Sequence, residues 1–137
     1  MRENRVLIVE DDLLVAIDVE HALLEAGYEV CGVARSEAEA LALAERLRPE
    51  LAIVDIALSP GDGRVVAQTL SRAYRTAVLF ATGQCNDVKS LRGTGALACL
   101  PKPYSSTNLS TALAAVRRMH DGDLTTPLPD HMIALAA

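Results

Sequence analysis

The chain has 137 residues, of which 50% are hydrophobic, so we expect one domain with a buried core and no separate output domain. The formal net charge of -5 and the absence of a cluster of Lys and Arg exclude the basic surface that binding to a nucleic acid requires. The charged start MRENR lacks the apolar core of a secretory signal, and no apolar run is long enough to cross a bilayer, so we expect a cytoplasmic protein with no membrane partner.

The first half of the sequence alternates short apolar runs with amphipathic stretches. Residues 6–9 are apolar throughout and end in acids, which is typical of a strand in a parallel sheet covered on both faces. Asp12 can cap the following helix, and Ser36 opens the next one with Glu39 at capping-box spacing. In chain order we predict a strand over 6–9, a helix from Asp12 to Gly27, a strand over 28–34, a helix from Ser36 to Pro49, and a strand over 51–54 that ends at Asp55.

The second half continues this alternation but contains one irregular segment. Residues 83–95 are rich in glycine and show only a weak helical turn at 88–91, so we expect this segment to be mobile. In chain order we predict a turn over 59–63, a helix over 65–73, a strand over 77–81 that ends at Thr82, the irregular segment, a strand over 96–100, and a helix with buried positions between 109 and 116.

Strands that alternate with helices in this way indicate an α/β fold. Because right-handed crossovers place helices on both faces of a sheet, we expect a doubly wound sheet of five parallel strands. We assign this domain to residues 1–120. Residues 121–137 contain two prolines and no clear period, so we expect them to form a flexible C-terminal tail.

Residues able to take part in chemistry stand at the carboxyl ends of four predicted strands. They are Glu10 with Asp11, Asp55, Thr82 and Lys102. Because the carboxyl ends of parallel strands lie at one edge of the sheet, we expect these side chains to converge. Carboxylates held together repel one another, and a hard cation such as Mg²⁺ relieves that repulsion. With a cation and Lys102 beside it, Asp55 can attack phosphorus, and Thr82 can hydrogen-bond a phosphoryl oxygen.

Each of these residues also has an ordinary explanation. Asp12 is better explained as a cap that complements the helix dipole than as a metal ligand. Taken alone, Asp55 would be a turn residue, Lys102 a surface lysine and Thr82 a strand former. Their combination at successive strand ends favours a shared site.

Four stretches of the sequence together resemble the receiver domains of two-component response regulators. They are VLIVEDD, LAIVDIAL, LFATG and LPKPY, at 6–12, 51–58, 79–83 and 100–104, and the resemblance runs from residue 6 to about residue 119. It implies a flavodoxin-like (βα)5 fold. Each motif alone is weak, but an acidic pair, an Asp, a Thr and a Lys-Pro in this order form a strong combined signal.

The resemblance also implies a role for each site residue. It implies that Mg²⁺ is bound by Glu10, Asp11, Asp55 and the backbone carbonyl of Ala57. It further implies that Asp55 is the phosphoacceptor, that Thr82 senses the phosphoryl group and that Lys102 pairs with it. In this family the bond between the lysine and the following proline, here Lys102 and Pro103, is commonly cis.

The function implied by the resemblance is that of a phosphoacceptor in a phosphorelay, not an enzyme that turns over a separate substrate. The phosphoryl donor would be the phosphohistidine of a sensor histidine kinase or of a phosphotransfer protein, and the signal would pass on through protein–protein contacts. The sequence leaves open the downstream protein and a homodimer formed near the fourth and fifth helices.

The sequence departs from the family at the positions of its switch aromatics. The stretch FATG is similar to the FAT GUY group of single-domain receivers, which carry a tyrosine shortly after the glycine, whereas here Gln84 and Cys85 follow. Ordinary receivers place an aromatic three residues before the lysine, and here that residue is Cys99. The alternative function is therefore a protein-binding adaptor that works without phosphorylation. An Asp-nucleophile phosphatase is disfavoured because Ala57 stands where its general acid would be.

The three cysteines, Cys31, Cys85 and Cys99, are widely spaced and form no CxxC pair. This pattern predicts neither a disulfide framework nor a zinc site, and it fits a reducing compartment. We interpret the cysteines as small apolar fillers. An exposed, redox-sensitive Cys85 in the mobile segment is the alternative hypothesis.

Overall fold

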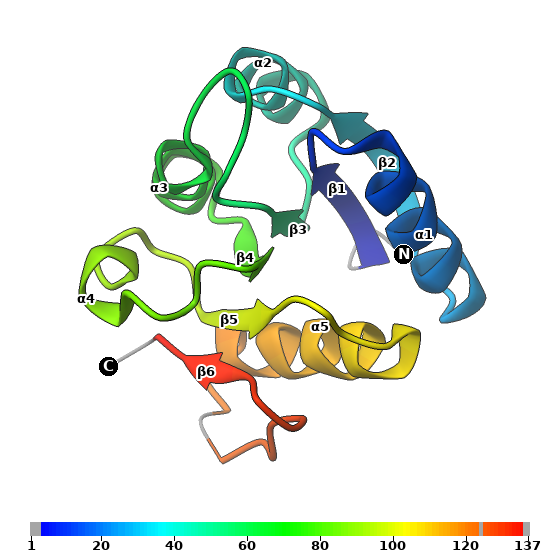
Figure 1. The fold of residues 1–137 in the computed structure, drawn as a ribbon, viewed down its shortest axis with the longest axis vertical. Helices are drawn as coiled ribbons and strands as arrows, with labels where there is room; N and C mark the ends of the chain where they lie inside the picture. Colours follow the sequence, from blue (N-terminus) through cyan, green and yellow to red (C-terminus); the bar gives the residue numbers. More distant parts are fainter. Residues whose placement is uncertain (1–3, 124, 136–137) are drawn as a thin grey trace.

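The computed structural model describes residues 4–123 and 125–135, so the first three residues of MRENR, residue 124 and the last two residues of the C-terminal tail lie outside the described residues. The chain forms one sheet with helices on both faces (Figure 1). The strands are β1 (Arg5–Val9), β2 (Glu29–Ala34), β3 (Leu51–Val54), β4 (Ala77–Thr82), β5 (Ala98–Pro101) and β6 (Ile133–Ala134). The helices are α1 (Leu13–Glu25), α2 (Glu37–Leu47), α3 (Gly63–Tyr74), α4 (Val88–Leu91) and α5 (Ser106–His120).

The strand order of the sheet is β2-β1-β3-β4-β5-β6. The first five strands pair in parallel, which confirms the predicted doubly wound α/β fold with five parallel strands. β1 and β3 are direct neighbours although β2 lies between them in the sequence. The winding direction therefore reverses at this pair, and α/β sheets bind ligands at such a switch point.

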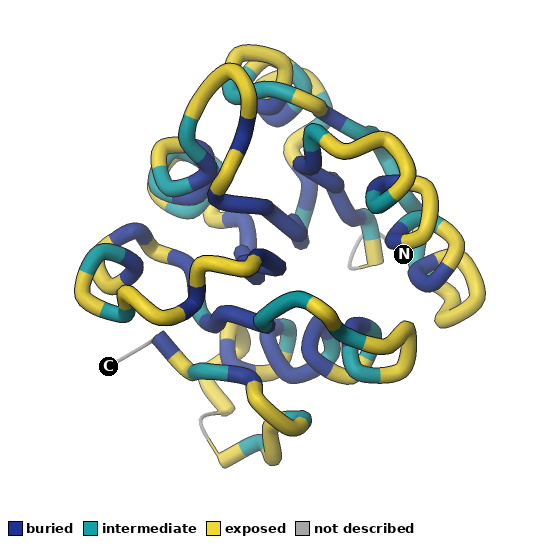
Figure 2. The backbone as a smooth tube through the Cα atoms, viewed as in Figure 1, coloured by how far each residue is buried: buried dark blue, intermediate teal, exposed yellow. Residues whose placement is uncertain are grey.

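Two hydrophobic clusters fill the space between the sheet and its helices. One cluster joins the sheet to α2 and α3, and the other joins it to α1 and α5. Successive residues of β1 alternate between them, because Leu7 and Val9 belong to the first cluster and Val6 and Ile8 to the second. All four side chains are buried, which explains the uninterrupted apolar run of this strand. Figure 2 shows the same burial along the central strands.

The two helix starts that the sequence predicted are present. Asp12 caps α1 by accepting the N–H groups of Leu14 and Val15. Ser36 caps α2 by accepting the N–H of Glu39 at 3.2 Å. Each cap satisfies backbone donors that have no partner within the helix. Among the helices of the described residues, none is both long and apolar enough to cross a membrane.

The sequence pattern predicted no regular element after residue 120, but β6 lies in that region. Ile133 pairs antiparallel with Cys99 at the outer edge of β5, and the N–H of Leu135 donates to the carbonyl of Leu97 at 2.9 Å. Met132 and Leu135 are buried, one in each hydrophobic cluster. The strand was missed because it has only two residues and follows a segment that contains two prolines. It covers the edge that β5 would otherwise leave open.

Candidate functional site

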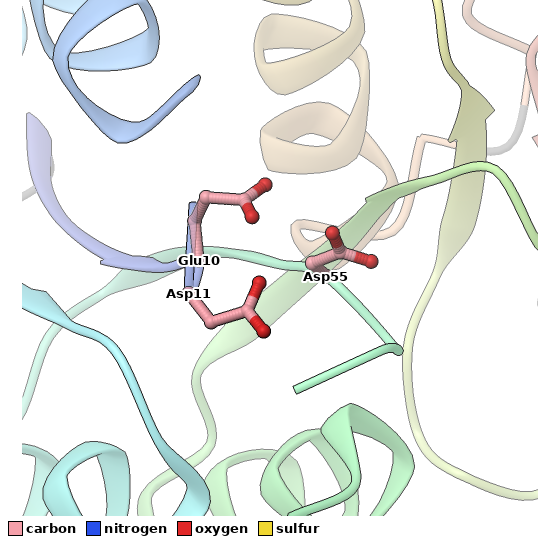
Figure 3. Close-up of side chains that lie close together, drawn as sticks. All are labelled: Glu10, Asp11 and Asp55. Carbon is pink, nitrogen blue, oxygen red and sulfur yellow. The ribbon is translucent and has the colours of Figure 1, made fainter. Parts of the chain in front are cut away.

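Three carboxylates meet where β1 and β3 end. Glu10 and Asp11 follow β1, and Asp55 follows β3, whose end is tied to β1 because the N–H of Asp55 donates to the carbonyl of Val9 at 2.9 Å. One oxygen from each carboxylate lies within 4.8 Å of the others. Figure 3 shows the three side chains extending into the same space. The structure thus brings together the acids that the sequence placed at separate strand ends.

Lys102, which follows β5, completes this cluster. Its Nζ donates to Oε1 of Glu10 at 2.8 Å and to Oδ2 of Asp55 at 2.7 Å. Burial alone would lower the pKa of Lys102, but the hydrogen bonds to the two carboxylates outweigh it and raise that pKa above its ordinary value. The bond between Lys102 and Pro103 is cis, as the family resemblance implied.

Burial makes the acidic cluster electrostatically costly. The side chains of Glu10 and Asp55 are only 6% and 8% exposed. Burial raises the pKa of Glu10, and the charge of Asp55 adds to that rise while the hydrogen bond from Lys102 opposes it. Three carboxylates facing one ammonium leave an excess of negative charge. The oxygen donors, their spacing and this excess all fit a hard divalent cation.

Backbone N–H groups fix the orientation of all three carboxylates. Each carboxylate accepts one such bond. The donor lies two residues further along the chain for Glu10 and Asp55, and in the loop after β3 for Asp11. The bonds run from Asp12 to Oε2 of Glu10 at 3.1 Å, from Ser59 to Oδ2 of Asp11 at 3.0 Å and from Ala57 to Oδ1 of Asp55 at 3.2 Å. The carboxylates are therefore held before any ligand arrives.

Thr82 and Ala57 lie at the margins of the cluster. Thr82 ends β4 and is buried, its Oγ1 accepts the N–H of Gln84 at 3.4 Å, and its carbonyl accepts the N–H of Lys102 at 2.9 Å. Ala57 is exposed in the loop after β3 and forms a short bridge with Asp62. Thr82 is thus tied through the backbone to the lysine of the site.

Gly63 supports the site in a way that the sequence did not reveal. It begins α3 and packs against the end of β3, and a Cβ at this position would overlap the carbonyl oxygen of Asp55. Its N–H also donates to the carbonyl of Ile56 at 2.8 Å. In the sequence, the only signal was a glycine in the turn SPGDG, and a turn alone does not show which atoms the glycine approaches.

The prediction that the cysteines form no disulfide is wrong, because Cys85 and Cys99 are joined by one. Their Cα atoms lie 5.9 Å apart, and both side chains are buried, so the hypothesis of an exposed Cys85 is wrong as well. Cys85 lies in the loop after β4, which folds back onto β5. That proximity depends on the loop path, which a separation of 14 residues in the sequence does not indicate. Cys31 is a free, half-buried cysteine on β2.

Comparison with known proteins identifies the family. A sequence model of the response regulator receiver domain matches residues 6–114. The chain belongs to this family. It is 38% identical over 121 residues to the transcriptional regulatory protein PdtaR of Mycobacterium tuberculosis, and the match covers 86% of this chain and 59% of PdtaR. It is 31% identical over 113 residues to the phyllosphere-induced regulator PhyR of Methylorubrum extorquens, covering 81% of this chain and 42% of PhyR. This receiver chain therefore spans only about half the length of these relatives.

Solved structures agree with this assignment. The signal receiver domain of a modulated diguanylate cyclase from Desulfovibrio desulfuricans G20 matches with a TM-score of 0.77 at 30% identity, covering 85% of this chain and 95% of that one. A CheY-like receiver domain protein from Methanospirillum hungatei matches with a TM-score of 0.77 at 28% identity, covering 86% and 96%. Receiver domains bind Mg²⁺ at an acidic pocket, and this chain has an acidic cluster of Glu10, Asp11 and Asp55.

Proposed function

We propose that this receiver accepts a phosphoryl group on Asp55 from the phosphohistidine of a histidine kinase or of a phosphotransfer protein. The observation that carries the proposal is the meeting of Asp55 with two further carboxylates and with the ammonium of Lys102 at one strand edge. We also propose that residues 1–120 form the receiver unit and that residues 121–137 are a C-terminal extension, of which β6 and its neighbours Met132 and Leu135 pack against that unit.

The acidic cluster is suited to Mg²⁺, held by Glu10, Asp11, Asp55 and the backbone carbonyl of Ala57. When bound, the ion supplies positive charge that stabilises the phosphoryl oxygens during transfer. The chain already restrains its own ligands, since backbone N–H groups hold the three carboxylates. Little reorganisation is then needed when the ion binds.

The transfer step makes one bond and breaks one. An oxygen of the Asp55 carboxylate forms a bond to phosphorus while the bond between phosphorus and the donor imidazole nitrogen breaks, and the electron pair of that bond stays on the nitrogen. Lys102 faces Asp55 and neutralises charge on the transferred group. We expect Thr82, which ends the neighbouring strand β4, to donate its hydroxyl to a phosphoryl oxygen; its Oγ1 accepts the N–H of Gln84 at 3.4 Å.

Intact-mass analysis after exposure to acetyl phosphate tests this proposal. We expect the wild-type chain to gain one phosphoryl group with Mg²⁺ and to gain none after chelation with EDTA. Asp55→Asn removes the nucleophile and should abolish the gain. Asp12→Asn is the matched control, because it also neutralises one acid, in the loop after β1 that carries Glu10 and Asp11, but keeps a good helix cap. Undiminished labelling of Asp55→Asn would contradict the assignment.

The alternative function is a protein-binding adaptor that does not use phosphorylation. It is favoured by one observation, that the two positions expected to hold a switch aromatic are joined in a disulfide instead. Affinity for a captured protein partner, measured with and without beryllofluoride and Mg²⁺, separates the two functions. Equal affinities in both states, and in Asp55→Ala, would favour the adaptor.

A further inference from the structure

The disulfide between Cys85 and Cys99 links the two strand ends that carry Thr82 and Lys102. Cys85 follows Thr82 by three residues, and Cys99 precedes Lys102 by three residues. In the sheet, Cys99 pairs with Phe80 of β4. The covalent bond therefore closes the loop after β4 onto the strand that leads to the lysine of the site.

Contacts around the disulfide connect it directly to Thr82. The Sγ of Cys85 lies 3.9 Å from the carbonyl oxygen of Thr82, and the same carbonyl accepts the N–H of Lys102 at 2.9 Å. On the loop side, the N–H of Gln84 donates to the hydroxyl of Thr82. Cys85 therefore directly follows the residue that donates to the hydroxyl of Thr82, and its sulfur lies beside the carbonyl of Thr82.

The disulfide itself is buried, but loop residues next to Cys85 are exposed. Ile133 of β6 pairs with Cys99, and Leu135 packs in the hydrophobic cluster that contains both cysteines. The residues that flank Cys85 in the chain, at 83–84 and 86–87, are exposed. Because Cys85 lies in this loop and not in a helix or strand, a local opening of the loop is enough to admit a reagent.

We propose that Cys85 and Cys99 are a reversible dithiol–disulfide pair, a second covalent modification site whose reductant is a dithiol, and that the disulfide holds the loop at Gln84 against Thr82 and slows phosphorylation of Asp55. The redox chemistry stands on the geometry of the pair alone. The effect on phosphorylation rests on the proposed function.

The two half-reactions balance with reagents of known class. In reduction, a thiolate of the dithiol attacks one sulfur, the bond between the two cysteines breaks and a mixed disulfide forms; the second thiol of the reductant then displaces the remaining cysteine. Two electrons and two protons pass to the protein, and the reductant leaves as a cyclic disulfide. In oxidation by a hydroperoxide, one cysteine becomes a sulfenic acid as an alcohol or water leaves, and the other cysteine displaces water to restore the disulfide.

The first experiment tests reversibility in the folded chain. It uses the Cys31→Ala variant, so that only the pair contributes thiols, with dithiothreitol as reductant and hydrogen peroxide as oxidant. We expect two alkylatable thiols after dithiothreitol without denaturant, and none after later peroxide treatment. Reduction that occurs only in denaturant would overturn the proposal, because the bond would then be a permanent structural link.

The second experiment measures the initial rate of Mg²⁺-dependent labelling by acetyl phosphate in the same variant. We expect the reduced form to be labelled at least about fivefold faster than the oxidised form, which is the lower end of common coupling between sites. Adding Cys85→Ala, or Cys99→Ala if the first variant folds poorly, should give the fast rate with or without dithiothreitol.

Equal rates in the two redox forms would overturn the coupling between the pair and Asp55. Absence of labelling in both forms would instead overturn the proposed function together with the coupling. The count of alkylated thiols does not depend on phosphorylation, so it still decides whether the pair is redox-active.

Discussion

The carboxyl ends of β1 and β3, called here the first edge, and the carboxyl ends of β4 and β5, called the second edge, are held together by different forces. At the first edge, carboxylates are arranged by hydrogen bonds from the backbone and from Lys102. At the second edge, a disulfide between apolar surroundings joins a loop to a strand, and β6 covers the outside. In our proposals, the first arrangement binds a cation and receives a phosphoryl group, whereas the second responds to thiols and oxidants.

The contacts that join the two edges show how a change at one can affect the other. The backbone ladder between β3 and β4 joins the two edges within the sheet. At the strand ends, Lys102 follows β5 but its side chain bonds Glu10 and Asp55, while its N–H donates to the carbonyl of Thr82. Lys102 is thus a residue through which a change at the second edge can reach the acids of the first.

Replacing Lys102 by Met should have the largest effect. The variant loses the positive charge that faces the transferred group, so we expect phosphorylation by acetyl phosphate to slow by about 100-fold. Mg²⁺ affinity should not fall, because the cluster becomes more negative. Lys89→Met, which changes an exposed lysine of α4, is the matched control. A normal phosphorylation rate for Lys102→Met would contradict the proposal that Lys102 connects the two edges.

Reduction of the disulfide should lower stability without touching the acids. Opening a loop closed over 14 residues should reduce the free energy of unfolding by about 3 kcal/mol. Urea unfolding of the Cys31→Ala variant, with and without dithiothreitol, measures the difference. An unchanged midpoint would show that the second edge is held by packing alone.

Replacing Gly63 by Ala should displace the backbone that carries Asp55 at the first edge. The new Cβ overlaps the backbone of Asp55, so we expect a loss of about 1–3 kcal/mol in unfolding free energy together with slower phosphorylation. Gly83→Ala is the matched control, because a Cβ there meets no atom within 4 Å. Chemical denaturation measures the unfolding free energy, and intact-mass analysis measures phosphorylation. Equal stability and equal phosphorylation of Gly63→Ala and Gly83→Ala would refute the role given to Gly63.

Replacing Asp62 by Ala should have the smallest effect, since it removes the cap of α3 and a solvent-exposed ion pair with Arg64. We expect a loss of about 1 kcal/mol at neutral pH. The hydrogen bond from Arg64 lowers the pKa of Asp62 below its ordinary value of 3.8. The carboxylate therefore stabilises the fold above that value, and its contribution disappears as the pH falls through the lowered pKa. Urea unfolding at neutral and acidic pH checks this, with exposed Asp130→Ala as control.

The sequence predicted the first edge well because its signals are local. Each acid directly follows an apolar strand, and the sheet topology alone brings Glu10, Asp11 and Asp55 together. The second edge was not predictable in this way. The pairing of Cys85 with Cys99 depends on how an irregular loop folds back, and β6 is too short to give a pattern. The role of Gly63 depends on an atomic approach that no spacing reveals.

A crystal structure of the chain grown with Mg²⁺ and beryllofluoride tests the central claim most directly. We expect beryllium on a carboxylate oxygen of Asp55, with Lys102 beside its fluorides and the Mg²⁺ ion bound by Glu10 and Asp11. A structure in which Asp55 carries no beryllofluoride, while the ion lies away from these acids, would contradict it.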